Sequence, residues 1–78
     1  MAKVVVTKDM RDAAKALVAL HADNLVAAPC DCGFRAVRGP ACIRCPNCNK
    51  RSPHTGQPEM RIALWNIGAR GKSFRWAP

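Results

Sequence analysis

Five cysteines dominate this sequence, and all of them lie in one stretch between Cys30 and Cys48. A chain of 78 residues buries too little surface to rely on its hydrophobic core alone, so it usually needs a disulfide, a metal ion or a partner chain. A disulfide framework fits poorly, because the number of cysteines is odd, we expect no secretory signal before them, and Cys30 and Cys32 are too close in sequence to bridge well. The cluster therefore predicts a metal site in the middle of the chain.

The spacing of the cysteines favours zinc. Zinc prefers four soft ligands in a tetrahedron, and two cysteines a few residues apart supply two of them from one tight turn. The residue after such a pair often has a left-handed backbone, which glycine adopts freely and asparagine next best, so that amide groups can point at the sulfurs. Gly33 and Asn49 occupy these positions. We therefore expect one structural zinc ion, bound by Cys30, Cys32, Cys45 and Cys48.

Cys42 is left over from this set, and its role stays open at the level of sequence. It could instead pair with Cys45, although Pro46 would then stand where glycine or asparagine is preferred and would offer no amide to the sulfur. In the preferred arrangement Cys42 is a small buried residue on the strand before the second turn. A third interpretation leaves all five thiols without metal. His21 and His54 fit helix packing and a solvated loop better than metal binding.

Residues 1–29 predict a short strand followed by one helix. Val4-Val5-Val6 is a β-branched run, and Thr7 suits the capping position of a helix that begins at Lys8 and ends near Asp23. Apolar residues recur along this helix at helical spacing, so we expect it to be amphipathic and to pack against the rest of the chain. The expected apolar face contains Met10, Ala13, Leu17 and Leu20, widened by Ala14 and Val18.

Residues 30–58 carry the expected metal site. Two short apolar runs at 34–38 and 41–44 predict strands, and turn residues separate these runs from each other and from the cysteine pairs. The loop that follows, 50–58, contains two prolines and a glycine and reads as irregular. We expect this region to share a single domain with both ends of the chain.

Residues 59–78 predict a basic and aromatic β-hairpin. The stretch from Glu59 to Ile67 alternates in part between apolar and polar residues, which indicates a strand, and 72–76 is suited to the return strand. Large aromatics in so small a protein are usually needed inside, so we expect Trp65 and Phe74 in the core. The whole chain is then a small α+β domain.

The charge of the chain is strongly positive and unevenly distributed. The formal net charge is +8. Residues 1–29 contain four basic and three acidic side chains, whereas residues 30–78 contain nine basic and two acidic ones. Such a surface implies a polyanionic partner, most often nucleic acid. An adaptor or inhibitor that docks on the acidic surface of a larger protein complex is the alternative.

We expect the partner to be RNA or single-stranded DNA, bound through phosphate contacts and base stacking. Basic side chains on the strands and after the second turn could follow a phosphate backbone, and an aromatic residue near the C-terminus could stack on bases. The candidate contacts are Arg35, Arg38, Arg44, Lys50, Arg51, Lys72, Arg75 and Trp76.

Enzymatic and membrane functions are not expected. The two serines lie in no nucleophile motif, the five carboxylates are scattered, and zinc with four cysteine ligands has no open position for water. No apolar run approaches the ~20 residues of a membrane span. We expect a cytoplasmic protein, because cytosolic thiols stay reduced and available to metal. We also expect no small-molecule substrate.

The cysteine turns also resemble those of zinc ribbons, in which β-hairpins surround one structural zinc. The matching residues are Cys30-Asp31-Cys32-Gly33 and Ile43-Arg44-Cys45-Pro46-Asn47-Cys48-Asn49-Lys50-Arg51. Among zinc ribbons the chain is similar to the Com family of Mu-like phages, although its first turn is Cys-x-Cys-Gly where that family has Cys-x-x-Cys. The resemblance implies a small zinc-binding translational regulator that binds a messenger RNA in the host cytoplasm.

Overall fold

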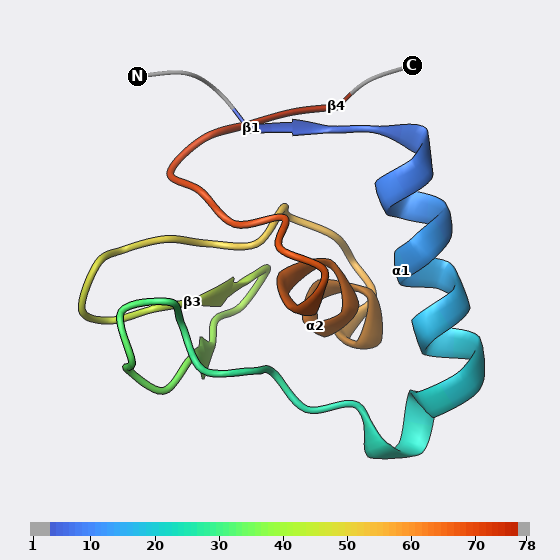
Figure 1. Ribbon diagram of the computed structural model, residues 1–78, viewed down its shortest axis with the longest axis horizontal. Coiled ribbons are helices and arrows are strands. Elements are labelled where there is room, and N and C mark those ends of the chain that lie inside the picture. Colours follow the sequence, from blue (N-terminus) through green and yellow to red (C-terminus); the bar gives the residue numbers. More distant parts are fainter. Residues whose placement is uncertain (1–3, 77–78) are drawn as a thin grey trace.

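The computed structural model describes residues 4–76, and its centre is occupied by a short helix (Figure 1). In chain order the elements are β1 (Val4–Val6), α1 (Lys8–His21), the 3-10 helix η1 (Ala22–Asn24), β2 (Val37–Arg38), β3 (Ile43–Arg44), α2 (Pro58–Asn66) and β4 (Phe74–Trp76). In the view of Figure 1, α2 lies between α1 and the β2–β3 hairpin, and β1 and β4 run across the top. Two α-helices and two two-stranded sheets confirm the predicted small α+β class.

The start of α1 is as predicted from the sequence. The hydroxyl of Thr7 accepts a hydrogen bond from the amide of Met10 at 3.2 Å and so caps the first turn. Asp9 lies in that turn, where the helix dipole favours a negative charge. The helix ends at His21 and continues into η1, close to the predicted end.

The buried face of α1 is turned slightly from the predicted one. Ala14 is fully buried and Val18 packs against the core beside it. Ala13 and Leu20, which were expected on this face, are exposed, Leu20 to 75%. The neighbouring α2 has nine residues against fourteen in α1, so it is too short to cover both ends of α1.

The segment predicted as a strand from Glu59 to Ile67 is a helix, α2, and this prediction was wrong. Pro58 occupies the first turn of α2, where its missing amide is tolerated. Four consecutive residues, Ile62 to Trp65, are buried. Over these residues α2 is buried on all sides and has no polar face, so the sequence lacks the period of an amphipathic helix.

Two hydrophobic clusters meet on α2, one on each side. The first cluster joins α2 to β1 and α1, and the second joins it to the cysteine region. Trp65 is fully buried in the second cluster, which confirms its predicted place in the core. The clusters contain Val6, Ala14, Ala63, Leu64 and Ala69, and Cys30, Ile43, Cys45, Ile62 and Trp65, respectively.

The predicted C-terminal hairpin does not form, because β4 pairs with β1 at the opposite end of the chain. The two strands are parallel, with Val4 opposite Phe74 and Val6 opposite Trp76. Phe74 is partly buried against the first cluster, so its predicted core position is met in part. The side chain of Trp76, predicted to stack on bases, lies outside the part of the chain that the structure describes.

The strands of the cysteine region lie where predicted, but they are shorter. β2 and β3 have two residues each and pair antiparallel, with Val37 opposite Arg44 and Arg38 opposite Ile43. Only Ile43 of these four residues is buried, against Trp65 and the cysteines of the second cluster. In residues 4–76, the helices are too short or too polar to cross a membrane.

The end of α2 gives a first testable prediction. Gly68 has φ +97, and the amides of Gly68 and Ala69 donate to the carbonyls of Trp65 and Leu64 at 3.1 and 3.0 Å, which closes the helix. An alanine would adopt this left-handed backbone at a cost of about 1 to 2 kcal/mol. We therefore expect Gly68→Ala to lower the free energy of unfolding by about that amount in urea titrations.

Gly56→Ala is the matched control for this variant. Gly56 has open space around its Cα and no left-handed backbone, so the added methyl group meets nothing. We expect its free energy of unfolding to stay within about 0.5 kcal/mol of the parent protein. Equal losses at the two positions would contradict the closing role of Gly68.

Candidate metal centre and basic hollow

Two tight turns of the same design carry the clustered cysteines. In the first, the amide of Cys30 donates to the carbonyl of Phe34 at 2.9 Å. In the second, the amide of Cys45 donates to the carbonyl of Lys50, also at 2.9 Å. Each turn is therefore closed by the backbone on both sides of its cysteine pair, and the side chains are left to point inward.

The residue after each pair has the predicted left-handed backbone. Gly33 follows Cys32 with φ +90, and Asn49 follows Cys48 with φ +63. In both turns the backbone N–H two positions beyond the second cysteine then hydrogen-bonds the sulfur of that cysteine. The predicted turn chemistry is confirmed, and its effect is to place N–H groups against sulfur.

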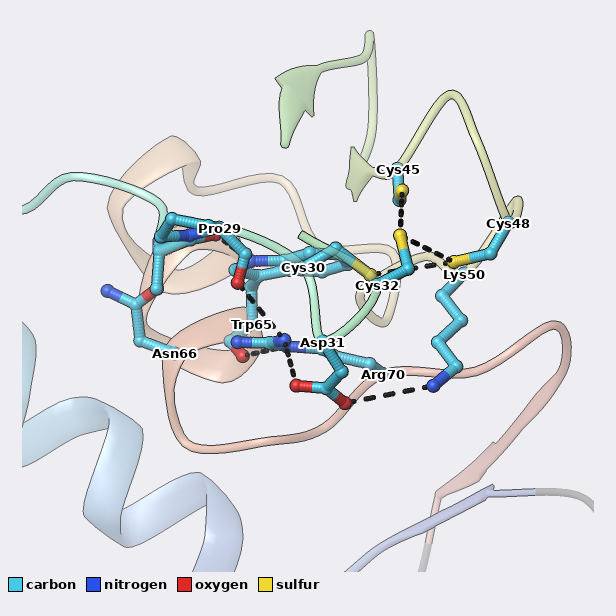
Figure 2. A network of polar contacts seen from close by, with 11 residues as sticks. Pro29, Cys30, Asp31, Cys32, Cys45, Cys48, Lys50, Trp65, Asn66 and Arg70 are labelled. Carbon is cyan, nitrogen blue, oxygen red and sulfur yellow. Dashed lines mark hydrogen bonds and ion pairs between the residues drawn. The ribbon is translucent and has the colours of Figure 1, made fainter. Parts of the chain in front are cut away.

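Four sulfur atoms meet at one point between the turns, as Figure 2 shows. The Sγ atoms of Cys30 and Cys48 are 3.5 Å apart, those of Cys32 and Cys45 are 3.5 Å apart, and Cys32 and Cys48 are separated by 3.9 Å. All four lie within 4.8 Å of one another. Four sulfurs at about 2.3 Å from a tetrahedral zinc ion would be separated by about 3.8 Å.

These spacings distinguish a metal site from a disulfide. A disulfide bond brings its sulfurs to about 2.05 Å, and all five cysteines are free. The described residues therefore contain a set of four soft donors that could hold one metal ion, and it is the set selected from the sequence.

The pKa values of Cys30, Cys32 and Cys48 are shifted in different directions. Hydrogen bonding from the side chain of Asn47, helped by a backbone amide, lowers the pKa of Cys32 to about 6. The amide of Lys50 lowers the pKa of Cys48. At Cys30 an amide also lowers the pKa, but burial and the three neighbouring thiols outweigh it and raise the pKa to about 11. The sulfurs compete for negative charge, and a bound cation would relieve that competition.

Cys42 lies outside this group. It is buried, as the preferred interpretation of the sequence predicts, and free, but it lies just before β3 and not on the strand. The fold does not bring Cys42 into the group with Cys45. Cys48 is the fourth member of the cluster instead. His21 and His54 are exposed and are not part of the group.

A charged network that the sequence did not reveal supports the turns (Figure 2). The guanidinium of Arg70 lies over the ring of Trp65, 4.4 Å from its centroid, and donates to the Trp65 carbonyl at 2.9 Å and to the Asp31 carboxylate at 3.0 Å. Asp31 also pairs with Lys50 at 3.7 Å. Asp31 belongs to the first turn and Lys50 closes the second, so the network connects both turns to the core.

The last residues of α2 hold the chain that leads into the first turn. The indole Nε1 of Trp65 donates to the carbonyl of Ala28 at 2.8 Å, and the Asn66 side chain accepts from the Ala28 amide at 2.8 Å. Asn66 also donates to the carbonyl of Val26 at 2.9 Å. These contacts fix the backbone just before Cys30, and no local pattern predicts them because their partners are about 40 residues apart in sequence.

Several of the predicted nucleic-acid contacts line one concavity beside the β2–β3 hairpin. We call it the basic hollow; it has a volume of about 710 Å³. Its cations come from β2, from β3, from the end of the second turn and from the segment before β4. His54 and Cys42 line it too, and the described residues of its wall include no carboxylate. The four cations are Arg38, Arg44, Arg51 and Lys72.

The remaining predicted contacts lie elsewhere. Lys50 pairs with Asp31 beside the cysteine cluster. Arg35 is exposed between the first turn and β2, and Arg75 is exposed on β4, and neither lines the basic hollow. The structure therefore gathers half of the predicted contacts at one place.

Comparisons with protein-family models, with curated proteins and with solved structures find no match to this chain. The resemblance to the Com family of zinc ribbons therefore stays a prediction.

The cysteine cluster gives a second testable prediction. Cys48→Ser replaces a soft thiolate with a poor zinc ligand and leaves three, so we expect bound metal to be lost and the domain to unfold largely. Metal content by mass spectrometry and the far-ultraviolet circular dichroism spectrum of the purified protein measure both effects. Retention of stoichiometric metal in Cys48→Ser would contradict the ligand set.

Cys42→Ser is the matched control, and Cys45→Ser extends the comparison. Cys42 and Cys45 are both buried, so serine adds a buried hydroxyl group at either position. Only Cys45 belongs to the cluster. We expect Cys42→Ser to keep its metal and Cys45→Ser to lose it. Loss of metal from both variants would show that burial, and not ligation, determines the outcome.

Proposed function

We propose that this protein is a small zinc-binding regulator that binds nucleic acid through its basic hollow and has no catalytic activity. The proposal has two parts, the identity of the metal and the nature of the partner. The first is supported by the cysteine cluster and the second by the charge of the hollow.

Zinc is the metal that the cluster suits best. Three of the sulfur–sulfur separations are 3.5 to 3.9 Å and all four sulfurs lie within 4.8 Å of one another, which fits the tetrahedral geometry that zinc adopts in structural sites of the ribbon type. A site with four protein ligands has no open position for water, so the zinc would stabilise the fold without activating a nucleophile. Zinc would thereby order the turn that ends beside Arg51 and the strand that carries Arg44.

The observation that carries the second part is the convergence of four cations on one concave surface. A run of basic residues along the chain is usually a solvated face, but these four come from separate segments and are brought together only by the fold. None of the described residues that line the hollow is acidic, so no side chain there neutralises these cations. Phosphates would do so, and each phosphate contact would release counterions from the nucleic acid.

The salt dependence of binding tests this function and is a third prediction. For four phosphate contacts on a single strand, log Kobs should fall against the logarithm of salt concentration with a slope of about −3. Arg44→Gln should weaken binding and make the slope shallower by about 0.7, the share of one phosphate contact. Fluorescence anisotropy with labelled RNA, single-stranded DNA and duplex DNA measures both quantities.

Lys15→Gln is the control for this experiment. Lys15 is exposed on α1 and lies outside the basic hollow, so the variant removes the same charge without touching the proposed site. We expect its slope to match that of the parent protein. An absence of binding to every probe at low salt would rule the function out and would favour the docking of an acidic protein.

A further inference from the structure

A second, smaller concavity adjoins the basic hollow. It has a volume of about 290 Å³ and shares three lining residues with the larger one: Arg51, His54 and Lys72. Phe74, at the start of β4, lines the smaller concavity but not the larger one. The two concavities are therefore joined along a shared wall, and that wall is cationic.

The cations are arranged in a way that costs stability unless an anion is present. Arg44 lies opposite Val37 in the β2–β3 ladder, and an antiparallel bridge places Arg51 opposite Arg44 on the other side. Like charges directly opposite one another in a sheet repel. Among the described residues, the carboxylate ion pairs are those of Asp31 with Lys50 and Arg70, so neither arginine of the row has such a partner.

The orientation of Arg51 is fixed by the backbone. Its Nη2 donates to the carbonyl of Lys72 at 3.1 Å, and the backbones of Arg51 and Gly71 exchange hydrogen bonds at 2.8 and 2.9 Å. Arg51 and Lys72 are thus held side by side on the shared wall. A guanidinium held in this way is prepared to bind a phosphate without a further loss of side-chain freedom.

The walls beyond the cations suit bases more than a duplex backbone. Apolar residues of the larger concavity, Val37, Pro40 and Ala41, offer a surface for the flat face of a base, and the rings of His54 and Phe74 line the smaller one. The larger volume falls within the range of about 300 to 1,000 Å³ that is usual for small-molecule sites, and the smaller is close to its lower limit. Bases of a duplex are inside the stack, and extruding one costs a few kcal/mol, whereas a single strand presents them freely.

We propose that the two concavities seat two successive nucleotides of a single strand, with the phosphate between them bound by Arg51 and Lys72. This inference rests on the proposed nucleic-acid binding. It narrows the ligand to a single strand that runs from one concavity to the other. One base lies against Val37 in the basic hollow, and the next stacks at His54 and Phe74. No contact to the 2′-hydroxyl group is proposed, so we expect RNA and DNA strands both to bind.

A comparison of the affinities for single strands and for their duplex tests the inference and is a fourth prediction. Labelled RNA and DNA single strands of one mixed sequence, and the DNA duplex of the same length, are titrated with zinc-loaded full-length protein at one salt concentration. We expect both single strands to bind at least about tenfold more tightly than the duplex, because the duplex must open to fill the concavities. His54→Ala should weaken single-strand binding by about fivefold or more and leave duplex binding unchanged.

Phe74→Leu provides a second variant at the smaller concavity, because leucine keeps the apolar contact with the core but has no ring to stack. Its thermal melting, compared with that of the parent protein, separates a loss of stacking from a loss of folding. Lys15→Gln again serves as the control for charge.

The outcomes separate this inference from the proposed function. Tight binding of single strands that is weakened by His54→Ala or by a folded Phe74→Leu supports both. Equal affinity for single strands and duplex, or single-strand binding unaffected by the two ring variants, overturns the seating of nucleotides and leaves nucleic-acid binding intact. Failure of all three probes to bind overturns the proposed function itself.

Discussion

The meeting of four cysteine sulfurs at one point is the constraint on which the rest of the structure depends. Cys30 and Cys45 belong to the candidate metal centre and are also buried members of the second hydrophobic cluster, together with Trp65 and Ile43. Binding of a cation and packing of this cluster therefore stabilise the same arrangement of the chain. In a protein of this size such coupling would make the binding of a metal ion part of the folding free energy.

The cysteine turns position the cations of the basic hollow, because these cations are next to the turns in sequence. Arg44 immediately precedes Cys45, and Arg51 immediately follows Lys50, whose carbonyl closes the second turn. The hollow's remaining wall, at Lys72, is tied to Arg51 by a side-chain hydrogen bond. We therefore expect a change in the metal centre to move Arg44 and Arg51, and with them the wall of the basic hollow.

Local chemistry could be predicted from the sequence, and long-range placement could not. Gly33, Asn49 and Thr7 act within a few residues of themselves, and each has the backbone or the hydrogen bond expected of it. By contrast, α2 is buried on all sides over its four residues from Ile62 to Trp65 and therefore shows no helical period there, and β4 pairs in parallel with a strand about 70 residues away. The basic hollow depends on such placements, since its wall joins Arg51 to a segment beyond α2.

The distribution of charge follows from these placements. A metal centre of four thiolates and one divalent cation would carry a formal charge of about −2, and Lys50 and Arg70 lie beside it with Asp31 between them. Together these groups would carry a net formal charge of about −1, so that region is nearly neutral. The cations of the basic hollow have no such complement, because neither Asp31 nor Glu59, the two acidic residues after Cys30, lines its wall. The excess positive charge is therefore concentrated where the surface is concave, and there the attraction of a phosphate chain is strongest.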